Sequence, residues 1–122
     1  MNFRLLLLFI TTLILFSCGS DGNAPNIDVT SPENGTSFSP GDIINFAARV
    51  TDDTGVATVQ VTSIGLGINV SNPITGQLLD VNYTLDITLI PETALDDYEL
   101  KITAVDIDGN FSDEETISIT VE

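Results

Sequence analysis

Apolar and polar residues alternate along most of this chain beyond residue 25, which is the pattern of β-strands with one buried and one exposed face. The alternation is most regular in residues 79–89, where every second position is apolar. Residues 97–104 repeat it and then run directly into an Asp/Gly/Asn turn at 106–110. Because no segment repeats apolar residues at helical spacing over several turns, the chain is predicted to be all-β.

Further alternating segments lie at residues 27–29, 44–50, 59–61 and 117–121. Between residues 59 and 70 the alternation changes phase, which predicts a bulge or a break near Ser63. Clusters of Gly, Pro, Asp and Asn separate the segments and are typical of turns. About seven short strands bounded by turns predict a single immunoglobulin-like antiparallel β-sandwich over residues 26–122.

The first 25 residues follow a different pattern. Arg4 precedes an apolar run at residues 5–16 that is interrupted only by Thr11 and Thr12. A helix needs about 20 apolar residues to cross a bilayer, so this run is too short to span one. It instead predicts a signal peptide over residues 1–17. Residues 18–25, rich in Gly, Ser, Asp and Asn, are expected to form a flexible tether.

The sequence at the end of this run, Leu15-Phe16-Ser17-Cys18, resembles the lipobox of bacterial lipoproteins. The resemblance implies that Cys18 becomes the lipidated first residue, carrying fatty acyl chains such as palmitate, and attaches the domain to a membrane. The domain would then lie in the bacterial cell envelope outside the cytoplasm, either at the cell surface or in the periplasm. An ordinary secreted protein with a free thiol is the alternative.

The chain is strongly acidic, with 18 Asp and Glu residues against 3 Lys and Arg residues and a formal net charge of −15. Nucleic acid and anionic lipid head groups are therefore not expected as partners, because like charges repel. Cations and basic protein surfaces fit this charge. A more common explanation for such a negative net charge is that it keeps an exposed protein soluble.

The composition argues against catalysis. The chain has no histidine and a single cysteine, so it can assemble neither Ser/His nor Cys/His catalysis, nor the usual ligand set for zinc. The acid pairs Asp96/Asp97 and Glu114/Glu115 could in principle serve a glycosidase. Adjacent acids in loops are usually solvated, however, and we expect no enzymatic activity.

Residues 31–61 and 95–113 resemble bacterial immunoglobulin-like and cadherin-like domains. The shared motifs are Gly41-Asp42 before a strand, an Asp-x-x-Gly turn at 52–55, and a strand that runs from Tyr98 into Ala-x-Asp-x-x-Gly-Asn at 104–110. These motifs specify a fold better than a function. Leu95 and Tyr98 also suit a tyrosine corner, in which the phenol bonds to backbone just upstream, so we expect both to be structural.

Five polar side chains are candidates for a calcium site. The turns at 52–55 and 106–110 are expected at the same end of the sandwich, and they carry Asp52, Asp53, Asp106, Asp108 and Asn110. Calcium takes about six to eight oxygen ligands in irregular geometry, and the resemblance to cadherin-like domains points to the same ion. The spacing is not that of an EF-hand. Turn formation alone is the favoured alternative, because such carboxylates cap their own backbone.

A second candidate site is the segment 72–76, which resembles one loop of the chagasin-like cysteine protease inhibitors. Its matching residues are Asn72, Pro73, Thr75 and Gly76. The resemblance implies a loop inserted toward a protease, but neither of the family's other two loop motifs is found here. An Asn-Pro…Gly hairpin turn explains the same residues.

Together these observations predict a membrane-anchored lipoprotein whose acidic domain serves binding, adhesion or spacing toward an unidentified protein or surface ligand. A protease-inhibitor-like binding protein is the alternative. One structural detail is also predicted: Arg49 and Asp86 should lie on neighbouring strands, where they could form an exposed ion pair.

Overall fold

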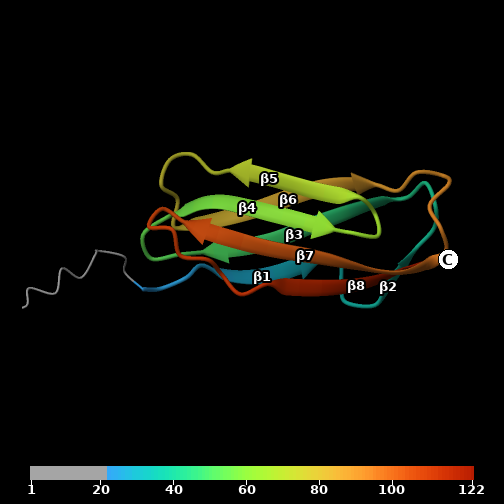
Figure 1. The fold of residues 1–122 in the computed structure, drawn as a ribbon, viewed down its shortest axis with the longest axis horizontal. Coiled ribbons are helices and arrows are strands. Elements are labelled where there is room, and N and C mark those ends of the chain that lie inside the picture. Colours follow the sequence, from blue (N-terminus) through green and yellow to red (C-terminus); the bar gives the residue numbers. More distant parts are fainter. Residues whose placement is uncertain (1–21) are drawn as a thin grey trace, which may run out of the picture.

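Two β-sheets pack face to face in the computed structural model, which describes residues 22–122 (Figure 1). The predicted signal peptide and Cys18 lie outside the described residues. The strands are β1 (Asn26–Ser31), β2 (Thr36–Phe38), β3 (Ile43–Thr51), β4 (Val56–Ser63), β5 (Ile68–Pro73), β6 (Asp80–Thr88), β7 (Asp96–Asp106) and β8 (Glu115–Val121).

One sheet has the strand order β1-β3-β6 and the other has the order β2-β8-β7-β4-β5. All pairings are antiparallel except that of β2 with β8. The predicted all-β sandwich is confirmed, with β2 as an additional strand. Because β2 has only three residues, its sequence shows no alternation that could reveal it. Among residues 22–122, no helix is long and apolar enough to cross a bilayer.

The alternating residues form the core as predicted. On β3 the side chains of Ile44, Phe46 and Val50 are at most 1% exposed, and on β7 Leu100 and Ile102 are fully buried. Burying one such side chain contributes roughly 1.5–3 kcal/mol, so the inner faces of the two sheets hold the sandwich together. β7 lies between β8 and β4, and it therefore occupies the centre of the larger sheet.

The change of phase near Ser63 is a chain reversal. β4 ends at Ser63, a turn covers residues 64–67, and β5 returns antiparallel to β4. The predicted break near Ser63 is therefore present, and Ile64 and Leu66, which resume the alternation in the opposite phase, lie in the turn, where Ile64 is 96% exposed.

Arg49 pairs with a different acid from the one predicted. β3 and β6 are neighbours, but Asp86 lies opposite Asn45, whose Nδ2 donates to it at 2.7 Å. Arg49 instead makes two bonds to Asp80, from Nη2 at 2.7 Å and from Nε at 3.0 Å. The strand register decides this choice, because it places Asp86 too far along β6.

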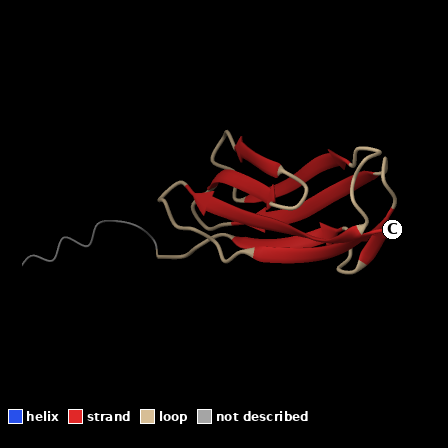
Figure 2. Cartoon of the chain, turned by 45° about the vertical axis from the view of Figure 1, so that its right-hand side comes forward, coloured by secondary structure: helices blue, strands red, loops and turns tan. Residues whose placement is uncertain are grey.

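Six of the connections lie at one or the other end of the sandwich (Figures 1 and 2). The loops 52–55, 74–79 and 107–114 lie at the end where residue 22 enters, which we call the entry end. The loops 39–42, 64–67 and 89–95 lie at the opposite end with residue 122, which we call the far end.

Ser63→Ala is expected to leave the free energy of unfolding unchanged or to raise it by up to about 1 kcal/mol. Ser63 is 2% exposed, and its Oγ has no hydrogen-bond partner among residues 22–122, so the substitution removes an unsatisfied buried hydroxyl. Urea unfolding followed by circular dichroism measures the change.

Ser112→Ala is the matched control. The Ser112 Oγ accepts the Ala104 N–H at 2.9 Å and donates to the Asp113 carbonyl at 2.9 Å, so its loss should lower stability by about 1 kcal/mol. Equal losses of stability in Ser63→Ala and Ser112→Ala would contradict the conclusion that the Ser63 hydroxyl is unsatisfied.

Candidate functional site

The turn at 52–55 is closed by a single carboxylate. Asp52 Oδ2 accepts the N–H groups of Thr54 and Gly55 at 3.0 and 2.9 Å, and the Thr54 hydroxyl at 2.9 Å. These bonds replace the backbone pairing that the chain loses where β3 passes into β4. Asp52 is therefore engaged by its own turn.

Asp106 plays the same part after β7. It is 2% exposed, and its Oδ1 accepts the N–H groups of Asp108 and Asn110 at 2.9 and 2.8 Å, while Oδ2 accepts the Asn110 side-chain amide at 2.8 Å. Burial by itself would raise the pKa of the Asp106 carboxyl. The hydrogen bonds from Asn110 and from the backbone outweigh burial and lower the pKa below its ordinary value.

The two turns do meet at the entry end, as predicted, since the Ile107 N–H donates to the Gly55 carbonyl at 2.9 Å. Among the described residues, however, this meeting of the turns does not group their acids as a metal cluster. Asp53 accepts a bond from Asn23 at 2.8 Å, and Asp108 lies exposed. Within residues 22–122, no three acidic, histidine or cysteine side chains are grouped so that they could hold a metal ion. Turn formation accounts for Asp52, Asp106 and Asn110.

The segment 72–76 is not a hairpin turn. Asn72 and Pro73 are the last residues of β5 and lie opposite Val59 and Thr58 of β4. Thr75 and Gly76 are exposed in the connection that crosses to the other sheet.

Asn72 has a structural partner in the facing sheet. Its Oδ1 accepts the hydroxyl of Tyr83 at 2.6 Å, and Tyr83 is only 6% exposed. Burial raises the pKa of this phenol, which keeps it a donor. Asn72 is therefore bound within the sandwich, which argues against the inhibitor-like use of this loop.

Tyr98 makes the hydrogen bond of a tyrosine corner. Its hydroxyl donates to the Ala94 carbonyl at 2.7 Å. The ring also lies against Gly65, where an added Cβ would come within 2.8 Å of Cδ1, so only glycine fits. Leu95 does not share this role. It is 68% exposed, because the loop 89–95 passes outside the end of the sandwich.

The predicted tether is in part attached to the domain. Gly22, Asn23 and Ala24 are exposed, but Asn23 bonds to Asp53 as described above, and Pro25 is buried. The domain therefore begins at Pro25, one residue earlier than expected.

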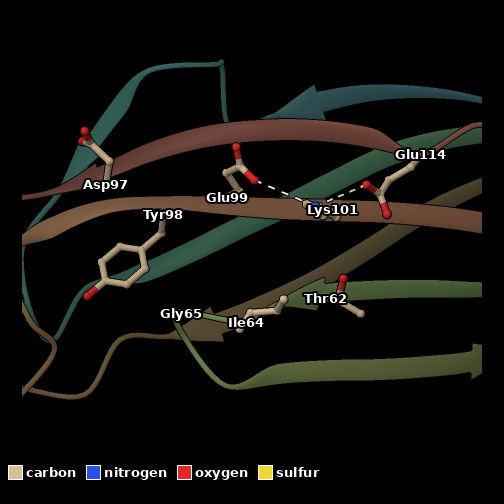
Figure 3. Close-up of a pocket in the computed structure, with 8 residues that line it drawn as sticks. All are labelled: Thr62, Ile64, Gly65, Asp97, Tyr98, Glu99, Lys101 and Glu114. Carbon is tan, nitrogen blue, oxygen red and sulfur yellow. Dashed lines mark ion pairs between the residues drawn. The ribbon is translucent and has the colours of Figure 1, made fainter.

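A groove on the outer face of the larger sheet was not predicted from the sequence. It has a volume of about 340 Å³ and lies between β7, the end of β4 and the segment before β8 (Figure 3). Lys101 lies in it, with Nζ 3.4 Å from Glu114 Oε1 and 3.9 Å from Glu99 Oε2. The groove depends on which strands are neighbours, and no local motif in the sequence indicates that.

The facing sheets, the crossing connections and the tyrosine corner define an immunoglobulin-like domain. The chain belongs to the family described as "Bacterial Ig domain", whose model matches residues 25–121. This confirms the resemblance to bacterial immunoglobulin-like domains. No curated protein sequence matches the chain.

Solved structures show the same fold. The fibronectin(III)-like modules of CbhA from Clostridium thermocellum are 29% identical, with a TM-score of 0.61 over 79% of this chain and 94% of that chain. The SrpA adhesin from Streptococcus sanguinis is 19% identical, with a TM-score of 0.60. The match covers 84% of this chain but only 59% of the adhesin. A Niemann-Pick type C2 protein from Japanese carpenter ant is 13% identical, with a TM-score of 0.53 over 86% of this chain and 96% of that one.

Asp106→Asn should lower the free energy of unfolding at pH 7 by about 1–3 kcal/mol, the range for buried hydrogen bonds to a charged group. The folded pKa is below the unfolded value of about 3.9, so the ionised Asp106 stabilises the fold above that pH. This contribution is lost as the pH falls through the folded pKa, and the two proteins should converge there. Urea unfolding at a series of pH values measures the difference.

Asp108→Asn is the control, because Asp108 occupies the same turn but is exposed. It should change stability little at any pH. A constant difference between wild type and Asp106→Asn from neutral to strongly acidic pH would contradict the role assigned to the Asp106 charge.

Proposed function

We propose that this chain is a lipoprotein, anchored outside the cytoplasm of a bacterium through lipid on Cys18, whose acidic Ig domain acts as a binding, adhesion or spacer module. The observation that carries the proposal is the placement of residues 22 and 122 at opposite ends of the long axis (Figure 1). A domain attached at its entry end presents its far end away from the membrane. Such a domain adds its full length as a spacer.

The dimensions support this role. The 11 residues of β7 run along the long axis, and at about 3.3 Å per residue they extend roughly 35 Å. Residues 18–24 add at most about 25 Å when fully extended. The far end could therefore stand clear of lipid head groups.

The match to the CbhA modules supports a modular role. The solved structures of similar fold include modules and an adhesin, although the adhesin is too distant to indicate more than the fold. In this chain the conspicuous acids Asp52 and Asp106 close turns, and no histidine is present. A role in catalysis is therefore not part of the proposal.

The placement of the loop at 74–79 favours display over protease inhibition. It belongs to the entry end, which faces the membrane if Cys18 is the anchor. Asn72 beside it is bonded to Tyr83. A protease would have to reach this loop from the membrane side.

Cys18→Ala is expected to abolish lipidation. Cells that express the wild-type chain and are fed an alkyne fatty acid should yield a labelled protein in the membrane fraction, whereas the variant should be unlabelled and leave that fraction. Ser20→Ala, in the same tether, is the control and should remain labelled. An unlabelled wild-type protein would refute the anchor.

Protease added to intact cells then tests the outward display. Cleavage of the domain would place it at the cell surface, and cleavage only after the outer membrane is opened would place it in the periplasm. Protection in both cases would contradict an extracytoplasmic location.

A further inference from the structure

The groove extends over β7 from the turn 64–67 to the segment before β8, and it combines an apolar wall with excess negative charge. It opens on the outer face of the larger sheet, and Gly65 and Tyr98 close it toward the far end (Figure 3). Apart from Glu114, its lining residues lie outside the loops of the entry end. Under the proposed function, this surface would be accessible to a partner outside the membrane.

Tyr98 and Ile64 form the apolar wall of the groove. The Tyr98 ring is fixed by its bond to Ala94 and by its contact with the backbone of Gly65. Ile64 beside it is 96% exposed, in a turn closed by the Gly67 N–H bond to the Ile64 carbonyl at 3.1 Å. This isoleucine contributes almost nothing to the core, so its apolar surface is available to a ligand.

The charged wall carries three carboxylates and one ammonium group. Asp97, Glu99 and Glu114 lie on the β8 side of β7 with Lys101 between Glu99 and Glu114, whereas Tyr98 and Ile64 lie on the β4 side (Figure 3). Lys101 is shared between Glu99 and Glu114, with the shorter contact to Glu114. The Asp97 carboxylate is positioned by a bond from the Thr120 hydroxyl at 2.7 Å. The groove therefore keeps a net negative charge and should repel anions.

We propose that this groove receives an arginine side chain of a partner protein. The aliphatic stem would lie along Ile64 and the Tyr98 ring, and the guanidinium would meet the carboxylates of Glu99 and Asp97. A planar guanidinium binds carboxylates through paired N–H groups and also stacks on aromatic rings. The volume of about 340 Å³ is at the lower limit for small-ligand sites, which suits one side chain and its neighbours.

This inference specifies the partner in the proposed binding function and rests on it. The proposed lipid anchor and the proposed arginine site can be refuted independently. Loss of the fatty acid label would refute the anchor and leave the groove untouched, whereas a failed titration with arginine peptides would refute the groove and leave the anchor intact.

The test is an NMR titration of the isotopically labelled full chain in zwitterionic detergent micelles. The probe is acetyl-Leu-Arg-Leu-amide, and the comparison probe carries citrulline, the neutral isostere, in place of arginine. The arginine peptide should shift the amide resonances of residues 62–65 and 97–101. These shifts should become smaller at higher salt, because salt screens an exposed ion pair. The citrulline peptide should shift them much less.

Three variants complete the test. Glu99→Gln removes a carboxylate and Ile64→Ser removes the apolar wall, and both residues are exposed, so neither change disturbs the core. Each should weaken binding by about two- to fivefold, the range for exposed ion pairs and similar small contacts. Glu33→Gln removes an exposed acid outside the groove and should bind as wild type. Equal shifts with citrulline, shifts spread evenly over all acidic positions, or unchanged binding by Glu99→Gln would overturn the proposal.

Discussion

The apolar layer between the two sheets is the constraint from which the other features of this domain follow. Because side chains on a strand alternate, the register that buries Leu100, Ile102 and Ala104 also turns Asp106 inward at the end of β7. A buried carboxylate is costly unless it is hydrogen-bonded. The next four residues fold around Asp106 and donate hydrogen bonds to its carboxylate. The burial of this side chain therefore determines the conformation of the following loop.

The same constraint explains the polar contact between the sheets at the edge of the core. Ile68, Val70 and Asn72 share the inward side of β5, and inward-facing Tyr83 on β6 reaches Asn72 across the gap. Each polar group satisfies the other, and together they join the edge strand β5 to the smaller sheet. Asn72, which belongs to the segment that resembles an inhibitor motif, thus has a structural role, because the register of β5 turns its side chain toward Tyr83.

The sequence predicted the fold because alternation is a local property. The faces of β3, β6 and β7 could be read from spacing alone, and the resemblance to bacterial immunoglobulin-like domains agreed with them. What could not be predicted depends on neighbours that are remote in sequence. Arg49 selects Asp80 because of the β3–β6 register, and β2 is defined by its pairing with β8 and not by its three residues. The groove likewise requires that β4, β7 and β8 lie side by side, which no single segment reveals.

The acids of this chain illustrate why residue type alone misleads about function. Asp52 and Asp106 lie in conspicuous Asp/Gly turns, yet Oδ2 of Asp52 and Oδ1 of Asp106 each accept backbone N–H groups, and a cation at those oxygens would have to replace these bonds. Glu99 and Glu114 lie in ordinary strand and loop sequence, but both are exposed and compete for one lysine. With more carboxylate than ammonium in the groove, an additional cation gains attraction without breaking a turn. The availability of a carboxylate for a ligand is thus decided by its hydrogen bonds, and those follow from the fold.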